Sequence, residues 1–282
     1  MILGIGTARA IICHWGFLSI LIGLSWGCAV KGSDRLALVL GNSDYAHSTV
    51  LKNPVHDADA LSQAFADLGF QVIRSQDLTK AAMESRFQEF YQKLENAEVA
   101  VFYYGGHGLQ LNSKNFLVPV DFDPGIEGYL ENQLVLLDGI LDQMAKQTPV
   151  NLVFLDACRD NPFSDTINAR ITQGRSVAID QRRGVRVVGK GLAEVKGNVG
   201  TFIAYATQPG NFALDGTGNN SPFAQGLLKH LGTPGLEIRE LLMKVRGSVV
   251  DETGGEQIPW DHSSLLERFY FKKKGNLSPP PP

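Results

Sequence analysis

Short runs of apolar residues recur along this chain, and they constrain its fold more than any other feature. The runs are residues 36–40, 99–104, 152–155 and 202–206, with a shorter one at 71–73. Segments whose apolar residues keep helical spacing lie between them. Strands without polar alternation are typical of a sheet that is covered on both faces. The pattern therefore predicts an α/β fold, with a mostly parallel sheet and helices on both faces.

Capping signals locate the helices between these runs. Asn53 is a candidate N-cap, Pro54 suits the first helical position, and Gly69 ends the predicted helix. Thr79 is a candidate cap for a second helix, whose apolar face starts at Met83. Further helices are predicted around residues 137–144, after Ser221 and over 238–249.

The composition is that of an ordinary globular protein, with 44% apolar and 20% charged residues among 282. The net charge of −3 indicates no basic surface, so we expect no nucleic-acid partner. The three cysteines, Cys13, Cys28 and Cys158, lack the clustered Cys and His spacing of a zinc site. A structural zinc site is therefore not expected.

The N-terminal segment is mostly apolar from residue 10 to residue 30. We interpret residues 1–29 as a signal peptide or, alternatively, as a membrane anchor, and only an uncleaved segment would make the membrane a partner. Cys28 also admits a lipoprotein interpretation, although Trp26 fits such a site poorly. We expect an exported protein, periplasmic or secreted. Cleavage after Ala29 would leave Cys158 as the only thiol.

Two candidate catalytic residues follow apolar runs. His107 comes after residues 99–104 and two glycines, and Cys158 comes after residues 152–155. The carboxyl ends of parallel strands form the crevice in which ligands bind. A thiol beside an imidazole at such an edge can form a thiolate–imidazolium pair, which is how a cysteine becomes nucleophilic at neutral pH.

The His-Gly and Asp-x-Cys pairs stand 51 positions apart in strand contexts, which is the caspase spacing. The chain resembles the bacterial caspase-like cysteine peptidases, relatives of the metacaspases. Further similar segments are residues 38–43, 51–58, 115–121, 206–210 and 257–260. The resemblance implies a caspase-hemoglobinase-like three-layer sandwich, with a peptidase domain over residues 33–272.

Membership in that family would make this chain a cysteine endopeptidase with a Cys-His dyad. Cys158 would attack the scissile carbonyl and form an acyl-enzyme, and His107 would transfer protons. The backbone N–H groups of Gly108 and Cys158 would form the oxyanion hole. No third triad member is evident in the sequence.

The resemblance also assigns a specificity pocket. In metacaspases, acids early in the first helix and two residues before the cysteine line the S1 pocket, and here these are Asp57 and Asp156. Asp215, after a later strand, is a further candidate. Such a pocket would bind Arg or Lys at P1 of a polypeptide substrate and repel Asp. His56 departs from the family pattern, which has Asn there.

No cofactor is expected. Asp121 matches one acidic position of the calcium site in calcium-dependent metacaspases, but the paired acids expected further on are reduced to Leu137-Asp138. The calcium site is therefore incomplete, and we expect no metal requirement.

Two segments depart from the alternating pattern. Residues 164–198 are polar and rich in Arg, and they correspond to an inter-subunit-type loop. Arg175, Arg182 and Arg183 belong either to a solvated loop or to sites at which the enzyme cleaves itself. Residues 273–282 form a Pro-rich tail that we expect to be disordered. The oligomeric state is not determined by the sequence.

Other functions remain open. A catalytically silent scaffold or signalling protein would use the same fold for binding, although such proteins typically lose the His or the Cys. A cysteine hydrolase of small esters or amides would keep both residues. A Rossmann-type nucleotide binder is excluded, because neither G-x-G-x-x-G nor a P-loop follows any predicted strand.

Overall fold

The computed structural model describes residues 34–111, 113–126, 130–158, 163, 166–167, 192, 197–208 and 213–274, without the side chain of Cys158. The N-terminal segment, residues Arg175, Arg182 and Arg183 of the 164–198 loop and most of the tail therefore lie outside the described residues. Within them, none of the helices combines the length and apolar character needed to span a bilayer.

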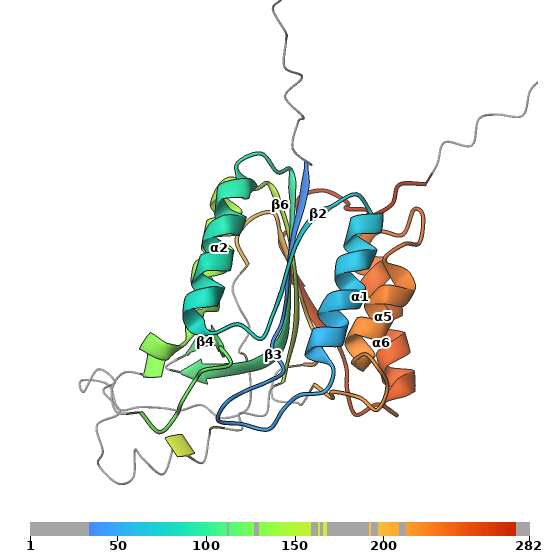
Figure 1. Ribbon diagram of the computed structural model, residues 1–282. Coiled ribbons are helices and arrows are strands. Elements are labelled where there is room, and N and C mark those ends of the chain that lie inside the picture. The colour runs from blue at the N-terminus through green and yellow to red at the C-terminus, as the bar shows by residue number, and fades with distance from the viewer. Residues whose placement is uncertain are drawn as a thin grey trace, which may run out of the picture. The chain divides into compact units, whose positions relative to one another are not determined.

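One sheet organises the described chain (Figure 1), and its strand order is β2-β1-β3-β6-β7-β8. The strands are β1 Arg35–Gly41, β2 Gln71–Gln76, β3 Val99–Leu111, β6 Val150–Cys158, β7 Thr201–Tyr205 and β8 Trp260–Ser263. All neighbours pair in parallel except β8, which runs antiparallel to β7. The predicted mostly parallel α/β sheet is confirmed.

Helices cover both faces of this sheet. Figure 1 shows α2 on one side and α1, α5 and α6 on the other. The helices are α1 Pro54–Asp67, α2 Lys80–Leu94, α3 Leu137–Gln147, α5 Pro222–His230 and α6 Ile238–Glu252. The Thr79 side chain caps α2 as predicted, by accepting a hydrogen bond from the Ala82 N–H at 3.3 Å. Asn53 precedes α1, but its side chain makes no capping hydrogen bond.

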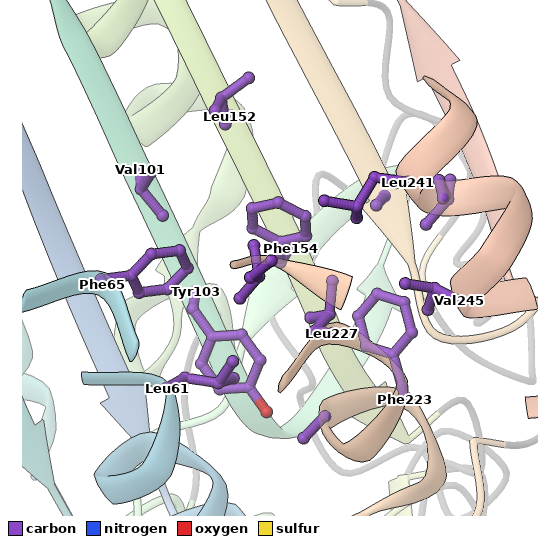
Figure 2. Close-up of a cluster of buried hydrophobic side chains, with 14 of the residues drawn as sticks. Leu61, Phe65, Val101, Tyr103, Leu152, Phe154, Phe223, Leu227, Leu241 and Val245 are labelled. Carbon is purple, nitrogen blue, oxygen red and sulfur yellow. The ribbon is translucent and has the colours of Figure 1, made fainter. Parts of the chain in front are cut away.

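Strand alternation divides the core into two layers. Along β1, Leu38 and Leu40 pack with α2 and α3, whereas Ala37 and Val39 belong to the layer under α1, α5 and α6. Figure 2 shows this second layer, in which side chains of α1, β3, β6, α5 and α6 meet. Its labelled members are Leu61, Phe65, Val101, Tyr103, Leu152, Phe154, Phe223, Leu227, Leu241 and Val245.

Strand β3 is longer than the sequence predicts. We expected the strand to end before the two glycines, but it continues through His107 to Leu111. Its first part pairs in parallel with β6, and its last residues pair antiparallel with β4, Lys114–Leu117. A further short strand, β5 Val135–Leu136, follows the single-turn helix η1, Leu130–Gln133, and pairs with β4. Pairing with β4 keeps β3 extended beyond the main sheet.

The start of α1 lies against the carboxyl ends of the central strands. A Cβ atom on Gly41, the last residue of β1, would stand 2.2 Å from the Pro54 carbonyl oxygen. A Cβ atom on Gly105 would stand 3.4 Å from the Pro54 Cβ. Glycine at 41 therefore permits the close approach that brings Asp57, in the first turn of α1, to the edge of the sheet.

Replacing Gly41 with alanine is expected to lower the free energy of unfolding by about 1–3 kcal/mol, because the methyl group would overlap the Pro54 carbonyl. Gly139→Ala in α3 is the matched control, since its Cβ would meet nothing within 4 Å. The control should gain up to ~1 kcal/mol from helix propensity. Chemical denaturation followed by circular dichroism measures both changes, and unchanged stability in Gly41→Ala would contradict the close packing.

Candidate active site

The pairing of β3 with β6 places the two candidate catalytic residues side by side. His107 and Cys158 are partners in the parallel register, one step beyond Gly106 and Ala157. Cys158 is the last residue of β6, whereas His107 lies within β3. The structure thus brings the two backbones together as the sequence analysis expected, at the carboxyl end of the parallel sheet.

Two tyrosines hold the backbone of His107. The His107 N–H donates a hydrogen bond to the Tyr45 hydroxyl at 2.7 Å, and the His107 carbonyl accepts one from the Tyr104 hydroxyl at 2.9 Å. Gly106 has φ of +149°, and a Cβ atom there would stand 2.6 Å from the Tyr45 hydroxyl and 2.8 Å from that of Tyr104. Glycine is therefore required where the tyrosines close around the strand.

The imidazole of His107 lies between two aromatic rings. Its centroid is 4.4 Å from that of Tyr45 and 5.8 Å from that of Phe163, and the residue is only 5% exposed. Neither ring nitrogen hydrogen-bonds to a described side chain, and the Thr49 backbone is a polar neighbour of the ring. Burial lowers the pKa of His107 from 6.5 to about 4, although the neighbouring Thr49 backbone opposes this shift. A neutral imidazole can accept the proton of a thiol.

The predicted oxyanion-hole residue Gly108 is covered by an apolar side chain. A Cβ atom on Gly108 would stand 3.0 Å from Leu192 Cδ2 and 3.3 Å from Ala157 Cβ. Leu192 is itself buried and packs with the layer under α2 and α3. A residue of the predicted inter-subunit-type loop therefore lies over the position at which we expect the oxyanion donors.

The three predicted S1 acids come together from three parts of the chain. Asp57 comes from α1, Asp156 from the end of β6 and Asp215 from the segment before α5. Asp156 is the register partner of Gly105. Asp57 and Asp156 are buried, with 2% and 8% exposure. No described Lys, Arg or His forms an ion pair with any of the three.

The partners of these acids differ in kind. Asp57 Oδ1 accepts hydrogen bonds from the Asn220 side-chain amide at 2.8 Å and the Ser221 N–H at 3.0 Å. Asp156 Oδ2 has two hydroxyl partners, a short hydrogen bond from Ser221 and one from Tyr103 at 3.4 Å. Hence Asp57 is held by two N–H donors together with the Ser221 hydroxyl, whereas Asp156 has hydroxyl partners only.

Asp215 is held by the segment before α1. Its carboxylate accepts the Lys52 N–H at 2.6 Å and the Asn53 N–H at 3.1 Å. The Asn53 side-chain amide donates a short hydrogen bond to the Asp215 carbonyl, which explains why Asn53 does not cap α1. The Lys52 ammonium donates to the Thr217 and Gly218 carbonyls, both at 2.9 Å, rather than to a carboxylate.

Burial and mutual repulsion change the acidity of this cluster. Desolvation raises the pKa of Asp156, and the negative charge of Asp57 raises it further. Desolvation likewise raises the pKa of Asp57, against the effect of its N–H donors. The pKa of the buried Tyr103 hydroxyl is raised by desolvation and by Asp156. The neighbouring acids Asp57 and Asp156 therefore compete for negative charge.

Several members of this site were not identified from the sequence. Ser221 was expected only as the start of a helix, and Asn220, Tyr45 and Tyr103 were not singled out. Ser-Pro before an apolar run does indicate a helix N-terminus. Nothing local indicates that this N-terminus lies against Asp57 and Asp156. His56 is exposed, as expected for a first-turn residue facing solvent.

No group of three or more side chains that could hold a metal ion occurs among the described residues. Asp121, the one match to the calcium position, accepts a hydrogen bond from the Lys80 N–H at 2.9 Å, in the first turn of α2. The Asp121 carboxylate is therefore a hydrogen-bond acceptor at the N-terminus of α2 in this structure.

Comparison with known proteins places the chain in context. A family model described as "Caspase domain" matches residues 34–270. The human mucosa-associated lymphoid tissue lymphoma translocation protein 1 and its mouse homolog are each 34% identical over 136 residues. That alignment covers 48% of this chain but only 16% of either relative.

A solved structure shows the same fold. The crystal structure of caspase-1 from Spodoptera frugiperda matches with a TM-score of 0.57 and 18% sequence identity, over 87% of this chain and 93% of that chain. The predicted caspase-like three-layer α/β fold is confirmed. The closer relationship to metacaspases stays a prediction.

The pKa of His107 predicts how stability depends on pH. The folded state binds the His107 proton less readily than the unfolded state, whose pKa is near 6.5. The contribution of the neutral, buried ring is therefore present above pH 6.5 and is lost as the pH falls toward 4. His107→Gln cannot titrate, so stability relative to this variant should decline for the wild type between pH 7 and pH 4. Urea denaturation across this range measures the difference, and a constant difference would contradict the shifted pKa.

Proposed function

This chain belongs to the caspase domain family, a family of cysteine peptidases, and we propose that it cleaves polypeptides after Arg or Lys through a Cys158–His107 dyad. The observation that carries this proposal is the group of three carboxyl groups beside the end of β6, with no ion-pair partner among the described residues. The group lies close to the proposed nucleophile in the sheet, because Asp156 precedes Cys158 by two residues on the same strand.

The proposed chemistry begins at the thiol of Cys158. The sulfur attacks the scissile carbonyl while the thiol proton passes to the neutral imidazole of His107. Backbone N–H groups of Gly108 and Cys158 would stabilise the oxyanion. The imidazolium then gives its proton to the departing amine, and water hydrolyses the thioester that remains on Cys158. Tyr45 and Tyr104 support these steps by holding the backbone of the base.

Specificity would follow from the cost of burying charge. A buried carboxylate without a cation carries a desolvation penalty, which an Arg or Lys side chain of the substrate can offset. A P1 aspartate would add a further negative charge to the same cluster and would be rejected. Guanidinium suits this site because several carboxylate oxygens can accept its N–H groups at once.

The described conformation is closed, so binding would require rearrangement. Phe163 packs against the ring of His107, and Leu192 lies over Gly108. Both belong to the chain that follows Cys158. Peptide access to the dyad would therefore displace these two side chains.

Fluorogenic peptides ending in Arg, Lys or Asp test this function on the full chain. We expect cleavage after Arg and Lys but not after Asp, and no cleavage by Cys158→Ala. Asp57→Asn and Asp156→Asn should each lower kcat/KM for the Arg substrate by roughly 30-fold or more, since one partner of a buried charge pair is lost. Parallel assays with calcium and with chelator test the expected independence from metal.

Asp59→Asn is the matched control, because Asp59 lies two residues after Asp57 on α1 but is exposed and paired with Arg74. Its kcat/KM should stay at the wild-type value. Cleavage only after Asp would overturn the S1 assignment but keep the peptidase. Folded protein with no activity in any assay would instead support a binding scaffold.

A further inference from the structure

We propose that this S1 pocket is proton-coupled through Ser221: Asp156 is a neutral acid while the pocket is empty, binding of a cationic P1 side chain releases its proton to solvent, and the Ser221 hydroxyl then stabilises the carboxylate. This inference rests on the proposed function, since it assumes that the three acids receive a P1 cation. It gives Ser221 a positioning role in specificity, because Ser221 acts on the substrate only through Asp156.

The hydrogen bonds of Ser221 connect both buried acids to the start of α5. Its N–H donates to Asp57 Oδ1 at 3.0 Å, and its hydroxyl is bonded to Asp156 Oδ2. The same oxygen accepts the Ala224 N–H at 3.0 Å, which makes Ser221 the N-cap of α5. Because the residue is buried and only 4% exposed, water does not compete for these bonds.

A serine hydroxyl can serve either protonation state of its partner. It has one proton to donate and two lone pairs, of which the Ala224 N–H occupies one. The hydroxyl donates to Asp156 when that group is a carboxylate. It accepts through the second lone pair when Asp156 is a carboxylic acid. Rotation of one hydroxyl proton thus adapts the site to both states without moving heavy atoms.

Asp57 differs, because two of its partners cannot accept a proton, although the Ser221 hydroxyl also contacts it. Its Oδ1 faces two N–H donors, the Asn220 amide and the Ser221 backbone, which cannot accept a proton in return. These donors favour the carboxylate form of Asp57, whereas Asp156 faces only hydroxyl groups. When two close acids share one negative charge, the different partners decide where it rests. The charge therefore stays on Asp57 and the proton on Asp156.

The surrounding charges support the same assignment. The groups that face the pair are Asp215, the Tyr103 hydroxyl and Lys52. The proximity of Asp215 raises the pKa of both acids, and the Lys52 ammonium is directed to the Thr217 and Gly218 carbonyls. Tyr103 stays protonated, because burial and the neighbouring acids raise its pKa well above 10. A cationic side chain of the substrate would stabilise the negative charge on Asp156 and so favour its ionised form over its neutral form.

Isothermal titration calorimetry measures the proton exchange directly. The full chain with Cys158→Ala is titrated with acetyl-arginine amide at pH 7, in phosphate and in Tris, whose ionisation enthalpies differ. The buffer dependence should correspond to roughly one proton released per bound ligand. Asp156→Asn, in the same background, should abolish the buffer dependence. Binding without proton release would overturn the inference but keep the acidic pocket, whereas no binding at any pH would overturn both.

Variants of Ser221 test its specific role through the pH profile of KM. In the wild type, KM for the Arg substrate should fall as the pH rises through neutrality, while kcat changes little. Ser221→Ala deprives ionised Asp156 of a donor, so the KM profile should move to higher pH and KM at pH 7 should rise about tenfold. Ser221→Thr keeps the hydroxyl and should restore the wild-type profile.

Thr79→Ala is the matched control for the lost helix cap. Thr79 caps α2 through the same type of hydrogen bond, made to the Ala82 N–H. Both alanine variants lose a cap, so both should lose stability to a similar extent. Only Ser221→Ala should move the KM profile. An unchanged KM profile in Ser221→Ala, with the protein folded, would show that the hydroxyl acts only as a cap and would overturn the inference.

Discussion

The candidate site depends on the parallel register between β3 and β6. This register pairs His107 with Cys158 and, two steps earlier, Gly105 with Asp156. A shift by one residue would turn Asp156 toward the opposite layer, because successive side chains of a strand face opposite sides. The apolar residues beneath prevent such a shift, since Tyr103 and Phe154 must face α1 and α5 while Tyr104 and Leu155 face α2 and α3. Core packing therefore positions the proposed catalytic and specificity residues together.

The parts of the fold that follow from local patterns were predictable. Apolar runs without alternation indicated the parallel strands, and the Thr79 cap and the Gly69 stop follow from backbone chemistry. The extension of β3 to Leu111 was not predictable in this way. It depends on pairing with β4, and Gly-Gly-His-Gly by itself is typical of a turn. Strand β8 was also missed, because its four residues are all half-buried and carry no apolar run.

Strand ends indicated His107 and Cys158, whereas the S1 roles of Asp57 and Asp156 were predictable only from a known family pattern. Asp57, Asp156 and Asp215 meet because α1 and the segment before α5 approach the same edge of the sheet, and no local rule indicates that approach. The residues that hydrogen-bond to the site residues lie far from them in the sequence. Tyr45 meets His107 across 62 positions, and Ser221 meets Asp57 across 164. Tyrosine and serine are common residues whose role depends on tertiary contacts, so sequence reasoning had no signal with which to single them out.

The site combines buried groups whose neutral forms are favoured by their surroundings. Burial disfavours the imidazolium of His107 and the carboxylate of Asp156 alike, although one is a base and the other an acid. In the empty protein this limits the number of buried charges without partners, which would otherwise weaken the fold. A cationic substrate changes the balance at Asp156 by supplying a partner, and a thiol proton does so at His107 during the reaction. Asp156 and His107 would then become charged only when substrate is present to stabilise the charge, which links the stability of the fold to the selectivity of the proposed enzyme.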